Sequence, residues 1–186
     1  MAFYKIVQGT TDQREEVGRM LPGLDELAPE VREKVITAWV TAWRNSSFKS
    51  LNDVPHQTMS HVSEVVEFGI AFAREALKHW EGRWNKPLDW QELMQALILH
   101  DLDKPLLYSE KSLLLWQIPH GVLGALILNE LGFSDNVVSA VATHSMQSPF
   151  HPSTAVSYLL HYADLFSTDH RLLEEGQEAF YQKHFR

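Results

Sequence analysis

The sequence predicts an all-α fold in a single domain. In one segment after another, apolar side chains recur at the spacing that places them on one face of a helix. No run of Val, Ile or Thr alternates with polar residues, and neither Asn-Gly nor Asp-Gly separates two apolar runs. No internal repeat, low-complexity stretch or Pro-, Gly- or Ser-rich linker divides the 186 residues. We therefore expect one compact helical domain.

Three helices are expected in the first half of the chain. Val31–Trp43 has an apolar stripe and ends in a polar run. Thr58–Leu77 has a longer apolar stripe and is followed by glycine and proline. Asp89–His100 begins with an N-cap candidate, has Glu92 at the capping-box spacing and ends before Pro105.

The second half is expected to contain four more helices. Gly121–Leu131 is largely apolar, and serine N-caps are predicted to open Ser134–His144 and Ser153–Phe166. Glu174–His184 is the last expected helix. Residues 1–56 are expected to form a helical extension that packs on the same core.

The composition excludes several classes of protein. The chain has no Cys, so a disulfide framework and a thiolate metal site are both excluded, whereas its ten His allow a metal site of imidazoles and carboxylates. A net charge of −8 argues against binding polymeric nucleic acid. Residues 1–11 do not resemble a signal peptide, and no segment approaches the roughly 18 apolar residues of a membrane span. We expect a soluble, cytoplasmic protein that does not bind membranes.

Polar residues lie on the faces of five expected helices that should point inward. They are His61, His100, Asp101, His120, His144 and Asp164. Burying any of these groups without a partner costs several kcal/mol, and a divalent metal that accepts imidazole nitrogen and carboxylate oxygen compensates all of them together. Taken singly, each histidine is more often a hydrogen-bonded core residue, so the prediction of a metal site depends on the ordered set.

That ordered set resembles the HD-domain superfamily of metal-dependent phosphohydrolases, over residues 56–171. Four short motifs carry the resemblance: His100-Asp101-Leu102-Asp103-Lys104 is similar to HD-x-x-K, His120 to Ala125 to H-x-x-x-G-A, His144-Ser145 to H-T, and Ala163-Asp164 to A-D. The resemblance implies an HD helical bundle at 57–171, with the extension at 1–56 and a C-terminal helix at 172–186. Asp103 departs from the family pattern, which usually has a small residue there, and Ser145 stands where Thr is usual.

The resemblance also implies an activity. His120 and His144 mark the two-metal branches, so the six residues are expected to bind two divalent ions, Fe or Mn, and the pattern is similar to the bacterial HD-type diadenosine tetraphosphate hydrolases. The expected substrate is a small nucleotide or phosphoester. Asp101 is expected to hold the ions together, and Lys104 to stabilise phosphate charge in the transition state.

Further candidate substrate contacts lie near the expected helix ends. Lys104 could contact a phosphate or be a solvated surface lysine, and Arg171 could bind an oxyanion in bidentate fashion. Residues that could reach the pocket or be ordinary surface residues are His56, His151, Trp116, Tyr108 and Phe150. His161 is a candidate to orient Asp164.

Two alternatives stay open on sequence alone. Some two-metal members of the superfamily are mixed-valence di-iron oxygenases, and the ligand set does not separate the two chemistries. The chain could also be a non-catalytic module that binds a nucleotide or a partner protein. The sequence leaves homodimer formation open.

Overall fold

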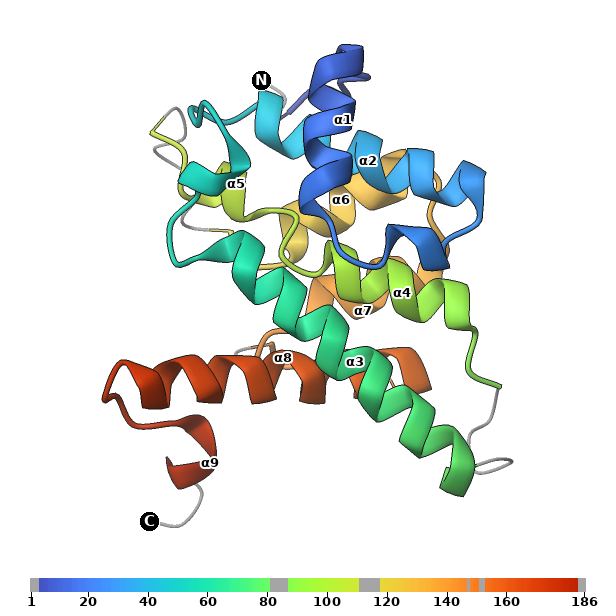
Figure 1. Cartoon of the computed structure of the whole chain (residues 1–186), viewed down its shortest axis with the longest axis vertical. Helices are drawn as coiled ribbons and strands as arrows, with labels where there is room; N and C mark the ends of the chain where they lie inside the picture. The colour runs from blue at the N-terminus through green and yellow to red at the C-terminus, as the bar shows by residue number, and fades with distance from the viewer. Residues whose placement is uncertain (1–3, 81–86, 111–117, 147, 151–152, 184–186) are drawn as a thin grey trace.

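The computed structural model describes residues 4–80, 87–110, 118–146, 148–150 and 153–183, and within these ranges the chain forms helices and loops without a strand (Figure 1). The helices are α1 (Thr11–Met20), α2 (Pro29–Arg44), α3 (Thr58–Trp80), α4 (Trp90–Leu99), α5 (Lys104–Leu107), α6 (Val122–Glu130), α7 (Asp135–Thr143), α8 (Ala155–Glu174) and α9 (Phe180–Lys183). Short 3-10 turns occur at Leu24–Glu26 and Leu51–Asp53. The predicted all-α fold is confirmed.

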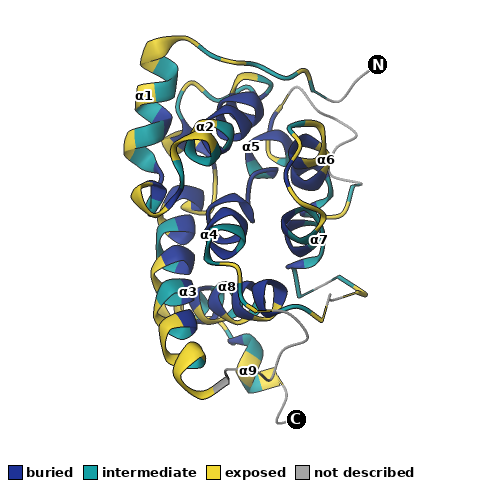
Figure 2. Cartoon of the chain, turned by 90° about the vertical axis from the view of Figure 1, so that its right-hand side faces the viewer, coloured by how far each residue is buried: buried dark blue, intermediate teal, exposed yellow. Residues whose placement is uncertain are grey.

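Helix α4 lies at the centre of the bundle. It packs against α2, α3, α7 and α8, and every residue from Leu93 to Leu99 is buried (Figure 2). A helix that is apolar and buried on all sides must lie inside the core. The end of α4 therefore delivers the next two residues, His100 and Asp101, into the interior of the protein.

The two longest helices, α3 and α8, pack against each other, and both also contact α4. Gly69 permits the close approach of α3 to α4, because a Cβ at this position would overlap the side chain of Leu97. This packing directs His61 on α3 and Asp164 on α8 toward the end of α4.

The first part of the chain packs on the same helices. α2 contacts α4, α5 and α6, and its Trp39 is fully buried, with the indole Nε1–H donating to the carbonyl of Ile98 at 3.1 Å. α1 packs against α2 and begins with a capping box at Thr10. Buried apolar residues from α1 to α8 belong to one continuous cluster.

Two predicted helix boundaries are wrong at the C-terminal end. The helix predicted to stop at Phe166 continues to Glu174, since Ser167 and Asp169 are buried and hydrogen-bonded instead of ending it. The predicted helix Glu174–His184 is reduced to α9 within the described residues, because the chain turns at Gly176, where φ is +68°. Asp169 then accepts the N–H groups of Phe180 and Tyr181 at the start of α9.

No helix in the described part of the chain is both long enough and apolar enough to span a membrane.

Candidate metal centre

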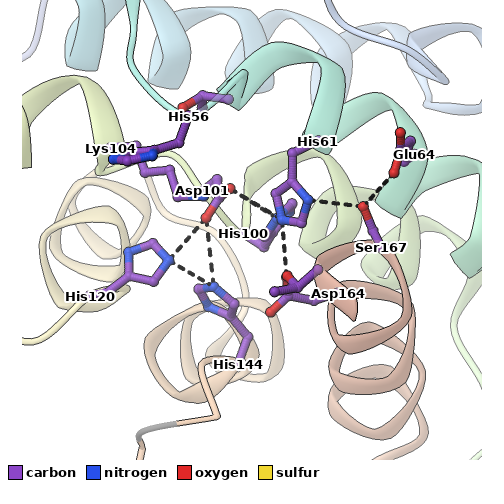
Figure 3. Close-up of polar contacts among 12 residues, drawn as sticks. His56, His61, Glu64, His100, Asp101, Lys104, His120, His144, Asp164 and Ser167 are labelled. Atoms are coloured by element: carbon purple, nitrogen blue, oxygen red, sulfur yellow. Dashed lines mark hydrogen bonds and ion pairs between the residues drawn. The ribbon is translucent and has the colours of Figure 1, made fainter. Parts of the chain in front are cut away.

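The six predicted metal ligands come from five different parts of the bundle and lie around one another (Figure 3). His61 is in the first turns of α3, His100 and Asp101 follow α4, His120 precedes α6, His144 follows α7, and Asp164 is on α8. Asp101, which is 1% exposed, lies at the centre. The structure therefore contains a buried His/Asp cluster that could bind a metal.

The first group consists of His61, His100 and Asp101, whose ligand atoms lie within 4.8 Å of one another. Asp101 Oδ2 is 3.3 Å from His100 Nε2 and 3.6 Å from His61 Nε2. His61 Nε2 also lies 3.0 Å from Asp164 Oδ1, so a second carboxylate borders this group.

The second group consists of Asp101, His120 and His144. Asp101 Oδ1 is 2.9 Å from His120 Nε2 and 3.9 Å from His144 Nε2, and the two Nε2 atoms are 3.1 Å apart. Asp101 thus turns one carboxylate oxygen to each group.

His100 and His144 are oriented by the helices that they end. Each Nδ1 lies next to the carbonyl oxygen three residues earlier, that of Leu97 at 2.9 Å and that of Val141 at 2.7 Å. Because a carbonyl only accepts, Nδ1 carries the proton in both rings. The other nitrogen, Nε2, points into the cluster and can present a lone pair to a metal.

His61 is oriented by a two-residue chain. Its Nδ1 lies 3.0 Å from Ser167 Oγ, and the Ser167 hydroxyl donates to Glu64 Oε2 at 2.8 Å. Because the hydroxyl hydrogen points to Glu64, the oxygen of Ser167 can accept a hydrogen bond from His61 Nδ1–H. Sequence reasoning missed both partners, although Glu64 follows His61, and Ser167 follows Asp164, by about one helical turn, which places them on the same helix faces.

His120 is oriented by Asp103, another partner that sequence reasoning did not assign. The Nδ1 of His120 lies 2.9 Å from Asp103 Oδ1, and a carboxylate can only accept there. All four rings therefore direct Nδ1 outward to a fixed partner and Nε2 inward to the cluster. This is the arrangement that outer partners impose on metal-binding imidazoles.

The cluster shifts the pKa values of its members in opposite directions. Burial opposes the charged form of His120, but hydrogen bonds to Asp101 and Asp103 raise its pKa to about 10. Burial and the neighbouring His120 lower the pKa of His144 to about 4. Despite burial, the hydrogen bond from His61 and the nearby imidazoles lower the pKa of Asp164. The cluster thus holds ionised carboxylates beside a protonated His120.

Lys104 completes this charge balance. Its ammonium contacts Asp101 Oδ2, and although burial disfavours both charges, this ion pair raises the pKa of Lys104 and helps hold that of Asp101 well below its usual range. Lys104 and the imidazoles therefore balance the negative charge of Asp101, which a bound divalent cation would otherwise neutralise.

The donor set fits a divalent metal. His100 Nε2 is fully buried and has no hydrogen-bond partner, an arrangement that is rare for a polar atom of a folded protein. Imidazole nitrogens and carboxylate oxygens are ligands of Zn²⁺, Mn²⁺ and Fe²⁺. An ion bound by the Nε2 lone pairs would take the place of the hydrogen bond between His120 and His144.

Some of the other predicted substrate contacts lie in or beside the cluster, and others are engaged elsewhere. Lys104 is inside the cluster, whereas the Arg171 guanidinium donates to the backbone carbonyl of His56 at 3.0 Å. The rings of His56 and Tyr108 meet with centroids 5.1 Å apart, and Figure 3 shows His56 beside Lys104. Their expected roles toward a substrate stay predictions.

Four further predictions concern Phe150, Trp116, His151 and His161. Phe150 is exposed, and Trp116 and His151 lie outside the described residues. His161 Nδ1 contacts the carbonyl of His144 at 3.2 Å, so this ring supports His144, and its expected role toward Asp164 stays a prediction.

Comparisons of the chain with protein-family models, with curated protein sequences and with solved structures found no match.

Proposed function

We propose that the protein is a metal-dependent phosphohydrolase of the HD type that acts on a small nucleotide or phosphoester through two divalent ions, Fe or Mn. The observation that carries this proposal is the common orientation of the four imidazoles, with every Nε2 directed at one shared carboxylate. Ordinary core histidines have no reason to converge in this way.

The geometry supports two sites in preference to one. His61, His100 and Asp164, with one oxygen of Asp101, would hold the first ion. His120 and His144, with the other oxygen, would hold the second ion. The second ion has fewer protein ligands, and the side chain of His120 is 27% exposed, so this ion has room for water or substrate.

The chemistry of such a pair suits phosphate hydrolysis. Two bound divalent ions supply positive charge for phosphoryl oxygens and lower the pKa of a water molecule. Lys104 contributes an ammonium within the cluster, where it can move from Asp101 to a phosphate oxygen once the carboxylate is neutralised. Asp101 fixes the separation of the two sites because it contacts both groups.

The test is hydrolysis by metal-free protein that is reconstituted with Mn²⁺ or Fe²⁺ and assayed without oxygen. The substrates are diadenosine tetraphosphate, nucleoside mono-, di- and triphosphates and a chromogenic phosphoester. We expect phosphate release that His144→Ala abolishes, while the exposed His79→Ala on α3 leaves it unchanged. In a parallel assay of the Fe²⁺-loaded protein in air, oxygen consumption without phosphate release would instead favour the oxygenase. Metal binding without turnover in either assay would favour a binding module.

A further inference from the structure

Asp103 is a buried carboxylate at the edge of the metal cluster, between the end of α4 and α5. It is 0% exposed and does not cap α5 with its side chain. A buried carboxylate requires strong compensation, so its contacts identify what holds it there. It is also the position at which the chain departs from the motif that its neighbours resemble.

Both oxygens of Asp103 contact the segment that carries His120. Oδ2 accepts the backbone N–H of Gly121 at 2.6 Å, and Oδ1 lies 2.9 Å from His120 Nδ1. Gly121 has φ of +91°, and a Cβ there would lie 2.5 Å from the carbonyl oxygen of Val141. The backbone can therefore pass this point only as glycine, and Asp103 holds that backbone and the adjacent ring together.

His120 needs such a partner because of its place in the chain. His100 and His144 follow helices, whose carbonyls fix their Nδ1 atoms, and His61 lies within α3. His120 precedes α6, and residues 118 and 119 before it are not helical. Among the described residues, Asp103 is the one that contacts its Nδ1.

We propose that Asp103 is the positioning residue for the second ion, and this inference rests on the proposed two-metal function. The carboxylate keeps the proton of His120 on Nδ1 and turns Nε2 toward Asp101 and His144. A carboxylate behind an imidazole also makes it a stronger metal ligand than a carbonyl does. Retention of the second ion thus depends on Asp103, whereas retention of the first does not.

Asp103→Asn tests this inference because it preserves the size of the side chain. The amide has one accepting oxygen, so it cannot accept from both Gly121 N–H and His120 Nδ1–H. If the oxygen stays with Gly121, the NH₂ group faces the ring and favours the tautomer with its proton on Nε2, which blocks the metal position. We expect the affinity for one of two Zn²⁺ ions to fall about 10- to 100-fold, with the other unchanged.

The measurement is Zn²⁺ titration against a chromogenic chelator, with wild type, Asp103→Asn, His120→Ala and the double variant. If Asp103 acts through His120, both single variants weaken the same ion, and Asp103→Asn has no further effect in the His120→Ala background. Asp169→Asn is the matched control, since Asp169 is also buried and uses both oxygens, in its case to accept two backbone N–H groups away from the cluster.

A second readout is the ring tautomer in the Zn²⁺-loaded protein, measured by long-range proton–nitrogen correlation. Wild type should show His120 with its proton on Nδ1 and zinc on Nε2. The inference is overturned if Asp103→Asn binds both ions as wild type does, if it weakens both ions equally, or if zinc is on Nδ1. Wild type that binds fewer than two ions overturns the proposed function as well, so the two failures are distinguishable.

Discussion

The two groups of the cluster hold their imidazole rings in different ways. In the first group, His100 uses the carbonyl of its own helix, and His61 uses the neutral hydroxyl of Ser167. In the second group, His120 lies before its helix and depends on the buried carboxylate of Asp103. Each group thus has one ring at a helix end that local backbone orients, His100 or His144, and one ring that requires a distant partner. That partner is a neutral hydroxyl in the first group and a buried carboxylate in the second. We expect the second ion to be the more easily lost.

Removal of the shared carboxylate should have the largest effect on metal affinity, and it should weaken both groups. Asp101→Asn takes a charged ligand from both ions, so we expect the affinity for each to fall by more than about 100-fold, beyond the usual cost of losing an outer partner. Isothermal titration with Mn²⁺ measures this. An effect of Asp101→Asn on only one ion would contradict the sharing of this carboxylate between the two groups.

Distortion of the loop should separate the two groups. Gly121→Ala combines a left-handed φ with overlap of the Val141 carbonyl, so we expect a loss of about 1–3 kcal/mol in unfolding free energy and selective loss of the second ion. Gly132→Ala is the control, because its φ is also positive at +71° but its Cβ would meet no atom within 4 Å. Both variants are compared by thermal unfolding and by metal content. Equal losses of stability and of bound metal in the two variants would contradict the role of the overlap.

The first group can be weakened without affecting the second. Ser167→Ala removes the acceptor for His61 Nδ1–H and the donor to Glu64. We expect the affinity for the first ion to fall about 10-fold, at the low end for an outer partner, because the α3 backbone still fixes His61. Ser157→Ala, a buried serine on the same helix, should leave the affinity unchanged. A larger loss of the second ion would contradict the pairing of Ser167 with the first group.

Protonation should link metal binding to pH mainly through the second group. The pKa of His120 is raised to about 10, so the metal-free protein carries this proton at pH 8 and must release it when Nε2 binds metal. Affinity for the second ion should therefore rise with pH up to about 10. Calorimetry in two buffers of different ionisation enthalpy should show about one more proton released by wild type than by His120→Ala. Equal proton release would show that another group supplies the proton.

The same proton should affect the stability of the metal-free fold. Since the folded pKa of His120 lies above the unfolded value of 6.5, its contribution is present below pH 6.5 and is lost as pH rises toward 10. The lowered pKa of Asp164 acts in the opposite sense, with a contribution present above pH 3.8 and lost in acid. The free energy of unfolding, measured as a function of pH in the presence of a chelator, should fall both as the pH rises toward 10 and in acid.

The six predicted ligands were found from the sequence because helical periodicity fixes which face a residue occupies. The end of α4 is the clearest case, since a run of apolar residues directs His100 and Asp101 inward. The outer partners depend on contacts between distant segments, so sequence spacing did not indicate that Ser167 accepts from His61. Asp103 was visible only as a departure from the motif, because its partners lie beyond the next loop.

The errors in the sequence analysis have a similar origin. The end of α8 was placed too early because Ser167 and Asp169 are polar, although tertiary contacts bury both. The proposed role of Arg171 as a phosphate contact stays a prediction, and its hydrogen bond to the His56 carbonyl was not predictable from spacing.

Native mass spectrometry with Mn²⁺ or Zn²⁺ tests the central claim most directly, because it counts the ions on each intact chain. We predict two ions on wild type, one on His120→Ala and none on Asp101→Asn at the same metal concentration. A wild-type chain without bound ions, or an ion count that these substitutions do not change, would contradict the two-metal assignment.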